Sequence, residues 1–296
     1  MVSVAARTVG RTFAVVAIAA ASVIVSASQA SIPARIVSTS PSITETLFAL
    51  DLADRIVGVS NYCRFPAEAA KLPKVGTFLK PDPELIARLK PDLVFVHTGP
   101  NATRTQLTTL GIQTASIDTG ALPQVFTTIR DIGAAASVPD RAERLVARIN
   151  ERLDRVKAAV AGRAPRKVLI IVGRRTGTLT DIVAVGRGSY LSDIAALAGG
   201  VNVLDAVTEY PRISMESVIR LAPEVLIDVG EMGESPVDSD RRRATTERLW
   251  ARETLVRAVR DGGVRVSTDE AWVVPGPRMV DIAELMAEWF HGVRLR

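Results

Sequence analysis

Short runs of branched apolar residues alternate along this chain with longer stretches in which apolar residues recur every three or four positions. The short runs predict β-strands and the longer stretches predict helices. In the first half we expect strands at residues 36–38, 56–59, 93–96 and 113–117, and helices at 42–50, 83–89, 102–110 and 123–136. In the second half we expect strands at 168–172, 225–229 and 264–267, and helices at 190–198, 215–221, 247–260 and 278–290. This alternation is typical of α/β units with parallel strands.

One longer helix is predicted between the two halves, over residues 139–162. Its apolar residues follow spacings of four, four, three and four, and so form one stripe: Leu145, Ile149, Leu153, Val156 and Val160. Such a helix spans about 30 Å at roughly 1.5 Å per residue, which is enough to cross a small domain. We therefore expect a rigid connection between two lobes.

The two halves also resemble each other in sequence. Residues 83–94 align without gaps to residues 215–226, with identical Glu, Arg, Leu and Pro at a constant offset of 132 residues. A short helix, a turn with Pro and an acidic residue, and a buried strand therefore recur once in each half. This recurrence favours a duplicated unit.

The first thirty residues have the features of a secretory signal peptide. Arg7 and Arg11 occur without any acidic residue, an apolar run covers residues 13–25, and small residues flank position 29. The apolar run is shorter than the roughly 20 residues of a membrane-spanning helix, and no cysteine follows it for lipid attachment. We predict a cleaved signal peptide (1–30) and a periplasmic location, then an N-terminal lobe (34–138), an interlobe helix (139–162) and a C-terminal lobe (163–296).

Composition narrows the classes of function. The chain is 47% hydrophobic and 23% charged, which is ordinary for a globular protein. Loss of the first 30 residues removes two arginines and no acid, so the net charge falls from +5 to +3, and we expect no nucleic-acid partner. With one cysteine (Cys63) and two histidines (His97 and His291), we expect no disulfide, no resident metal site and a buried, inert thiol.

Several segments resemble the periplasmic binding proteins that serve cobalamin, heme and ferric-siderophore ABC importers. These segments are residues 35–47, 57–60, 65–69, 72–76, 89–94, 186–190 and 198–203. The resemblance extends in one unbroken order over residues 34–291. It implies an α/β fold: two α/β lobes with central parallel-type sheets joined by one long rigid interlobe helix, around a cleft that closes only modestly.

Residues 61–66 and 76–78 look more like the cobalamin-binding branch than the heme-binding branch. The resemblance implies that Tyr62, Phe78 and Tyr210 pack on the corrin, and that residues 269–273, with Asp269 and Trp272, complete the pocket. Phe78 and Tyr210 stand where the cobalamin binder has tryptophans, and only Asp269 matches within residues 269–273. Heme and a ferric siderophore therefore stay open as alternative ligands.

The physical chemistry of the ligand agrees with these positions. A corrin or porphyrin is a flat, largely apolar ring, so its site needs aromatic faces and a few polar side chains. The aromatic candidates and His97 lie in loops near the ends of predicted strands, where open α/β sheets bind ligands. His97 has two interpretations, an axial ligand to cobalt or iron or a polar cap at the edge. A siderophore would instead use arginines, for which the candidates are Arg64, Arg174, Arg187 and Arg278.

Glu84 and Glu216 are equivalent positions in the duplicated unit. The resemblance implies that they form salt bridges with arginines of a dimeric ABC permease. Paired carboxylates at the two ends of a pseudo-symmetric protein would orient it on a basic dimeric surface.

We therefore predict a monomeric receptor that is not an enzyme, has no cofactor, and carries cobalamin as its transported ligand. An exported hydrolase is the alternative of another class, but the chain has no Gly-x-Ser-x-Gly motif and would depend on His97 or His291. A third class is a structural or sensory module that has kept the fold and lost transport.

Overall fold

The N-terminal half is built around a four-stranded parallel sheet. The computed structural model describes residues 2, 32–98, 102–230 and 239–295. The sheet has the order β2-β1-β3-β4, and each neighbouring pair is parallel. The elements of this half are β1 (Ile36–Ser38), α1 (Pro41–Ala49), η1 (Ala53–Arg55), β2 (Ile56–Val59), α2 (Ala67–Ala70), α3 (Pro83–Arg88), β3 (Leu93–His97), α4 (Ala102–Thr109), β4 (Thr114–Ile117) and α5 (Leu122–Ala135).

The C-terminal half is built around a mixed sheet of the order β10-β9-β5-β6-β8, with β7 also paired to β5. Strand β9 pairs in parallel with β10 and β5, and β5 also pairs in parallel with β7, whereas β6 is antiparallel to both β5 and β8. Its elements are β5 (Arg166–Gly173), β6 (Ile182–Ala184), α7 (Tyr190–Leu197), β7 (Gly200–Asn202), β8 (Arg212–Ile213), α8 (Met215–Leu221), β9 (Val225–Asp228), α9 (Ser239–Trp250), α10 (Arg257–Arg260), β10 (Val264–Val266), η3 (Glu270–Val273) and α11 (Met279–His291).

The α/β fold class is confirmed, and the second sheet differs from the prediction in its short strands. Strands β6, β7 and β8 have only two or three residues each. A segment of that length shows little of the alternation by which a strand is recognised in sequence. The antiparallel pair β6 and β8 was not predicted.

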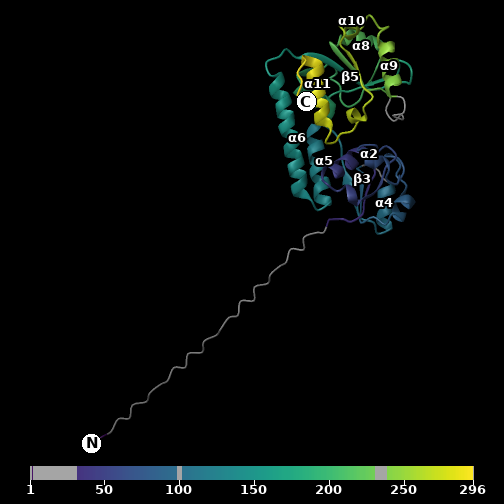
Figure 1. Ribbon diagram of the computed structural model, residues 1–296, viewed down its shortest axis with the longest axis vertical. Helices are drawn as coiled ribbons and strands as arrows, with labels where there is room; N and C mark the ends of the chain where they lie inside the picture. Colours follow the sequence, from purple (N-terminus) through teal and green to yellow (C-terminus); the bar gives the residue numbers. More distant parts are fainter. Residues whose placement is uncertain (1, 3–31, 99–101, 231–238, 296) are drawn as a thin grey trace. The chain divides into compact units, whose positions relative to one another are not determined.

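Helix α6 (Pro139–Val160) lies between the two sets of elements in the sequence and packs against both. Its apolar stripe is buried, as predicted, and contacts α5 from the N-terminal half and α11 from the C-terminal half (Figure 1). The helix ends at Val160, and Gly162 then adopts a left-handed φ of 78°, which allows the chain to turn away. The division into lobes at residues 34–138 and 163–296 stays a prediction, as does the signal peptide, which lies outside the described residues except for Val2.

The duplicated unit is visible in strand register. Ile36 of β1 pairs with Leu93 of β3, and Val168 of β5 pairs with Val225 of β9. Both members of the second pair lie 132 residues beyond those of the first, the offset found in the sequence. The central strand pair of each sheet is therefore the same unit used twice.

Hydrogen bonds repeat at the same offset. Asp92 accepts a hydrogen bond from the backbone N–H of Arg35 at 2.8 Å, and Glu224 accepts one from the N–H of Lys167 at 3.0 Å. The backbone N–H groups of Asp92 and Glu224 donate in return to the carbonyls of Arg35 and Lys167. Asp92 and Glu224, which each follow a proline of the duplicated unit, thus link the two central strands of each sheet at their start.

The largest hydrophobic core cluster extends through both halves. It includes Ile36 of β1, Leu153 of α6, Ile170 of β5 and Phe290 of α11. Because side chains from both sheets pack on α6 and its neighbours, the connection between the halves is a packed core and not a free linker. Among the described residues, every helix is too short or too polar to serve as a membrane span.

The single helix predicted over residues 247–260 is wrong in its start and its continuity, and only its end at Arg260 is observed. Helix α9 begins earlier, at Ser239, and ends at Trp250, and the short helix α10 follows only at Arg257. The break lets both Trp250 and Val256 reach the second core cluster, and Trp250 Nε1 donates a 2.7 Å hydrogen bond to Asp228. The interruption between α9 and α10 thus accompanies the burial of Trp250 and Val256 in the same core cluster.

Candidate functional site

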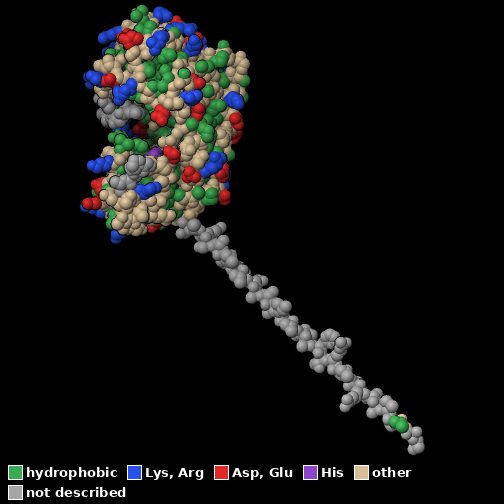
Figure 2. All heavy atoms as spheres, turned by 180° about the vertical axis from the view of Figure 1, so that it is seen from behind, with side chains coloured by type: hydrophobic (Ala, Val, Ile, Leu, Met, Phe, Trp, Pro, Cys, Tyr) green, Lys and Arg blue, Asp and Glu red, His purple; other side chains and the backbone are tan. Residues whose placement is uncertain are grey.

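Several of the predicted ligand residues lie at or just after the carboxyl ends of strands in the two sheets. Tyr62 follows β2, His97 ends β3, and Asp269 follows β10. The carboxyl ends of parallel strands meet at one edge of a sheet, where α/β proteins place their sites. Seen from behind, the surface is hollowed between the two halves (Figure 2).

Tyr62 and Phe78 occupy two loops that are tied together by the backbone. The N–H of Asn61 donates a 2.9 Å hydrogen bond to the carbonyl of Gly76. Gly76 has a φ of 98°, and a Cβ there would lie 2.8 Å from the carbonyl oxygen of Lys80, so the turn that carries Phe78 requires glycine. Tyr62 is 38% exposed and Phe78 is 37% exposed. Both rings therefore keep a free face for stacking.

His97 lies against Phe78, a pairing that the sequence did not predict. The ring centroids are 4.5 Å apart and the planes meet at 82°, an edge-to-face arrangement. Burial lowers the pKa of His97, and the carboxylate of Asp118 only partly opposes this effect. The imidazole is therefore neutral at pH 7, which is the form that binds metal ions.

Tyr210 belongs to the C-terminal half and is 49% exposed. Its hydroxyl lies 3.1 Å from Ser189 Oγ, and Ser189 caps the N-terminus of α7. The backbone of Arg187 exchanges hydrogen bonds with Val207 and Glu209, which joins the two loops around the tyrosine. Tyr210 is thus anchored at its hydroxyl and open on its ring.

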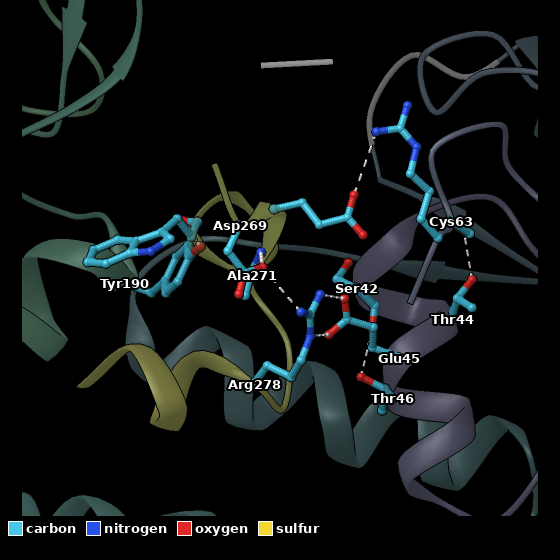
Figure 3. A network of polar contacts seen from close by, with 12 residues as sticks. Ser42, Thr44, Glu45, Thr46, Cys63, Tyr190, Asp269, Ala271 and Arg278 are labelled. Carbon is cyan, nitrogen blue, oxygen red and sulfur yellow. Dashed lines mark hydrogen bonds and ion pairs between the residues drawn. The ribbon is translucent and has the colours of Figure 1, made fainter. Parts of the chain in front are cut away.

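Asp269 caps η3 and belongs to a network that the sequence did not predict. Its carboxylate accepts a 2.8 Å hydrogen bond from the N–H of Ala271 and lies 3.4 Å from Arg278 Nη1. Arg278 also binds Glu45 of α1, at 2.8 and 2.5 Å (Figure 3). The sequence predicts Arg278 only as a contact for an anionic ligand. Its partner Glu45 lies 233 residues away, so no local signal links the two residues.

Trp272, which is predicted to complete the pocket, is buried. Its side chain has no exposed surface and stacks on Trp289 of α11, with centroids 5.3 Å apart and planes at 13°. Its carbonyl accepts a 2.7 Å hydrogen bond from the buried Tyr190 hydroxyl. The ring is part of the core because η3 turns it inward, so Trp272 has no face to offer a ligand in this arrangement.

The arginines considered for a siderophore are largely engaged. Arg174 is 2% exposed and donates a 3.0 Å hydrogen bond to the fully buried Asp228. Arg64 lies 3.9 Å from Glu270, and Arg278 binds Glu45. Arg187 is exposed. Three of the four guanidinium groups therefore already face carboxylates, which weighs against an arginine-lined site for an anionic chelate.

Cys63 is buried, as expected, between two hydroxyl groups. Thr44 donates to its sulfur at 3.1 Å, and the Ser60 hydroxyl lies 3.2 Å from it. Burial raises the pKa of the Cys63 thiol, although these hydrogen bonds act in the opposite direction. The thiol is therefore unreactive at neutral pH.

Glu84 and Glu216 are exposed in the first turns of α3 and α8. The preceding caps are Asp82, which accepts from the N–H groups of Glu84 and Leu85, and Ser214, which accepts from the N–H of Ser217. A hydrogen bond from Ser214 lowers the pKa of Glu216. Both halves thus present a carboxylate at an equivalent, solvated position.

A cavity of about 490 Å³ lies elsewhere, between α1, α6 and the start of α11. Its lining includes Phe48, Phe65, Ile149 and the Glu45–Arg278 pair, and none of the six predicted ligand residues. We do not assign it to the ligand. In the described part of the chain, no group of three or more His, Cys, Asp or Glu side chains is placed to hold a metal ion.

Comparisons with known proteins agree with this arrangement. A family model described as periplasmic binding protein matches residues 36–271. A vitamin B12-binding protein of Salmonella typhi is 32% identical over 203 residues, which cover 68% of this chain and 74% of that protein. The crystal structure of the periplasmic vitamin B12 binding protein of Vibrio cholerae has a TM-score of 0.70 and 25% identity, covering 87% of this chain and 96% of that one. A periplasmic heme binding protein from Pseudomonas aeruginosa has a TM-score of 0.75 and 24% identity, with 88% and 94% coverage.

Proposed function

The chain belongs to the periplasmic binding protein family, and we propose that it captures a corrinoid, cobalamin, between its two halves and delivers it to the permease of an ABC importer. The observation that carries this proposal is the exposure of Tyr62, Phe78 and Tyr210. These three rings come from both halves: Tyr62 follows β2, Phe78 lies between α2 and α3, and Tyr210 lies between β7 and β8. Exposed aromatic faces are what a flat apolar ligand requires. The vitamin B12-binding relative with 32% identity supports the same ligand class.

Heme is the second candidate ligand, and His97 is the observation that favours it. Its burial keeps the imidazole neutral, and neutral imidazole is a common axial ligand of heme iron. Phe78, against which His97 packs, would then contact the porphyrin edge.

An exported hydrolase has less support. Periplasmic binding proteins are substrate-binding transport proteins and not enzymes. His97 packs on Phe78, and His291 lies 3.3 Å from the carbonyl oxygen of Gly199 in the C-terminal half. Neither contact is the hydroxyl and carboxylate pair of a Ser-His-acid triad.

The test is isothermal titration of residues 31–296 with cyanocobalamin, hemin and a ferric siderophore in parallel. We expect saturable one-to-one binding of cyanocobalamin with a Kd on the order of 1 μM or tighter, which corresponds to about 8 kcal/mol. Tyr210→Ala should weaken this binding and leave the unfolding temperature nearly unchanged, because the ring is half exposed. Leu255→Ala, which removes another exposed apolar side chain, is the matched control.

A preference for hemin or the siderophore would keep the receptor role and overturn cobalamin. Hemin binding that is lost in His97→Ala would assign the second candidate. Turnover of ester substrates without any binding of the three ligands would contradict the receptor role itself.

A further inference from the structure

Arg278, at the start of α11, contacts three different segments of the protein. Its Nε and Nη2 donate to the two carboxylate oxygens of Glu45, at 2.8 and 2.5 Å. Its Cζ lies 3.8 Å from the centroid of the Phe65 ring, and its Nη1 lies 3.4 Å from Asp269. One planar guanidinium thus makes a two-pronged ion pair, a cation–π contact and a third charge contact.

These contacts join the two loops that carry predicted ligand residues. Phe65 follows Tyr62 in the loop after β2, and Asp269 caps η3 in the C-terminal half. Figure 3 shows Arg278 reaching from the segment before α11 toward Glu45 of α1 on one side and Asp269 on the other. The side chain therefore bridges the halves next to the proposed site.

The ion pair between Glu45 and Arg278 is largely buried, which restricts its geometry. The side chains of Glu45 and Arg278 are 3% and 15% exposed. Burial raises the pKa of Glu45, although the hydrogen bonds and charge of Arg278 act in the opposite direction. A buried ion pair adds little net stability, but the loss of one partner leaves the other charge without compensation. The pair consequently holds the groups to one arrangement.

A second contact between the same loops is weaker. Arg64 Nη1 lies 3.9 Å from Glu270, and the two side chains are 30% and 31% exposed. Partly exposed ion pairs at such a distance contribute little. Arg278 contacts both segments, through the Phe65 ring at 3.8 Å and the partly exposed Asp269 at 3.4 Å, and it is also tied to Glu45 by the short, buried ion pair.

We propose that Arg278 is a positioning residue, which holds the Tyr62 loop and the Asp269 segment in the arrangement that binds ligand without contacting the ligand itself. This inference rests on the proposed function for its ligand. It differs from the role of an anion contact, because the guanidinium is already occupied by Glu45.

The matched control is Arg152 of α6. Arg152 also makes an ion pair between two elements, with Glu284 and Asp281 of α11 at 2.7 Å each, and its side chain is 34% exposed where that of Arg278 is 15% exposed. It contacts neither of the two loops in these interactions. Arg278→Met and Arg152→Met therefore remove the same charge from similar ion pairs, and only the first touches the proposed site.

The first measurement is titration with cyanocobalamin. We expect Arg278→Met to raise the Kd about tenfold, within the usual range for coupling between neighbouring groups. Arg278→Lys keeps the charge without the planar fork, so its Kd should lie between those of Arg278→Met and the wild type. Arg152→Met should bind as the wild type does, even if its unfolding temperature falls as far.

The second measurement is amide hydrogen exchange of the ligand-free protein. Residues 61–65 and 269–273 should exchange faster in Arg278→Met and at the wild-type rate in Arg152→Met. If Arg278→Met shows wild-type exchange there, or if Arg152→Met accelerates the same amides equally, the positioning role is wrong.

The two measurements separate the inference from the proposed function. A wild-type protein that does not bind cyanocobalamin would overturn the proposed ligand, and the exchange measurement alone would then decide the role of Arg278. Equal losses of affinity in Arg278→Met and Arg152→Met would reduce Arg278 to a general stabilising residue and overturn the inference. If Arg278→Met does not fold, Arg278→Lys carries both measurements.

Discussion

His97 shows at the residue scale how burial sets a chemical state. Its ring is half-buried at the end of β3, with Phe78 at its edge and Asp118 as the charged group that opposes the shift. The lowered pKa means that the folded protein resists the proton that the unfolded chain accepts near pH 6.5. The stability that His97 contributes is therefore complete above pH 6.5 and is lost as the pH falls through the lower, folded pKa.

We predict that His97→Gln flattens the pH dependence of stability. Between pH 7.5 and pH 5, the free energy of unfolding should fall less in the variant than in the wild type, measured by urea denaturation. An NMR titration of the imidazole protons should give a pKa below 6.5 for the signal that the variant lacks. Equal pH slopes in the two proteins would contradict the prediction.

The sequence does not predict which aromatic side chains are exposed and which are buried. Tyr210 and Trp272 are both predicted site residues, and Tyr210 is 49% exposed whereas Trp272 is fully buried. Residue type and position in a loop are the same signal for both. Which side of η3 faces the core depends on packing against Trp289.

Helices α3 and α8 show the duplicated unit at the element scale. Each is followed by a non-glycine residue in the left-handed region, Lys90 and Ala222, and both have a φ of 46°. The residues lie 132 positions apart, so the unit keeps this turn even without glycine. A left-handed conformation costs an L-residue about 1–2 kcal/mol.

We predict that Lys90→Gly and Ala222→Gly each stabilise the protein. Relief of the left-handed strain exceeds the entropy that glycine adds to the unfolded chain, so the free energy of unfolding should rise by roughly 0.5–1 kcal/mol. Ala158→Gly, at an exposed position inside α6, is the control and should destabilise by about 1 kcal/mol. Thermal unfolding of the three variants measures the sign directly, and destabilisation by all three would refute the strain argument.

At the scale of the whole molecule, each half exposes one glutamate of the duplicated unit, Glu84 in α3 and Glu216 in α8. We propose that Glu84 and Glu216 dock onto basic side chains of a dimeric permease. The two halves that carry these carboxylates share the core cluster around α6. Complementary charges of this kind set orientation and encounter rate more than affinity.

The double variant Glu84→Ala/Glu216→Ala should bind cyanocobalamin normally and fail to support its uptake by cells. The control is Glu68→Ala/Glu247→Ala, which removes two other exposed carboxylates, one from each half. Uptake that survives the first double variant would show that these glutamates do not dock. Uptake that is absent in the wild type as well would favour a module that has lost transport.

The sequence by itself determined the elements and their repetition. Strands 36–38 and 56–59 and helix 215–221 were predicted with their observed bounds, because short runs and recurrent spacings of apolar residues mark them locally. The buried stripe of α6 and the offset of 132 residues were likewise readable from local pattern. Recognition of the family followed from the same ordered segments.

Only the tertiary structure decided which of these residues meet. The Glu45–Arg278 pair spans 233 positions, and the strand pairing of β6 with β8 depends on neighbours outside either segment. Packing also turned Trp272 into the core and left Tyr210 open. Local patterns report the faces of single elements, whereas contacts between distant residues arise only when those faces are packed against one another.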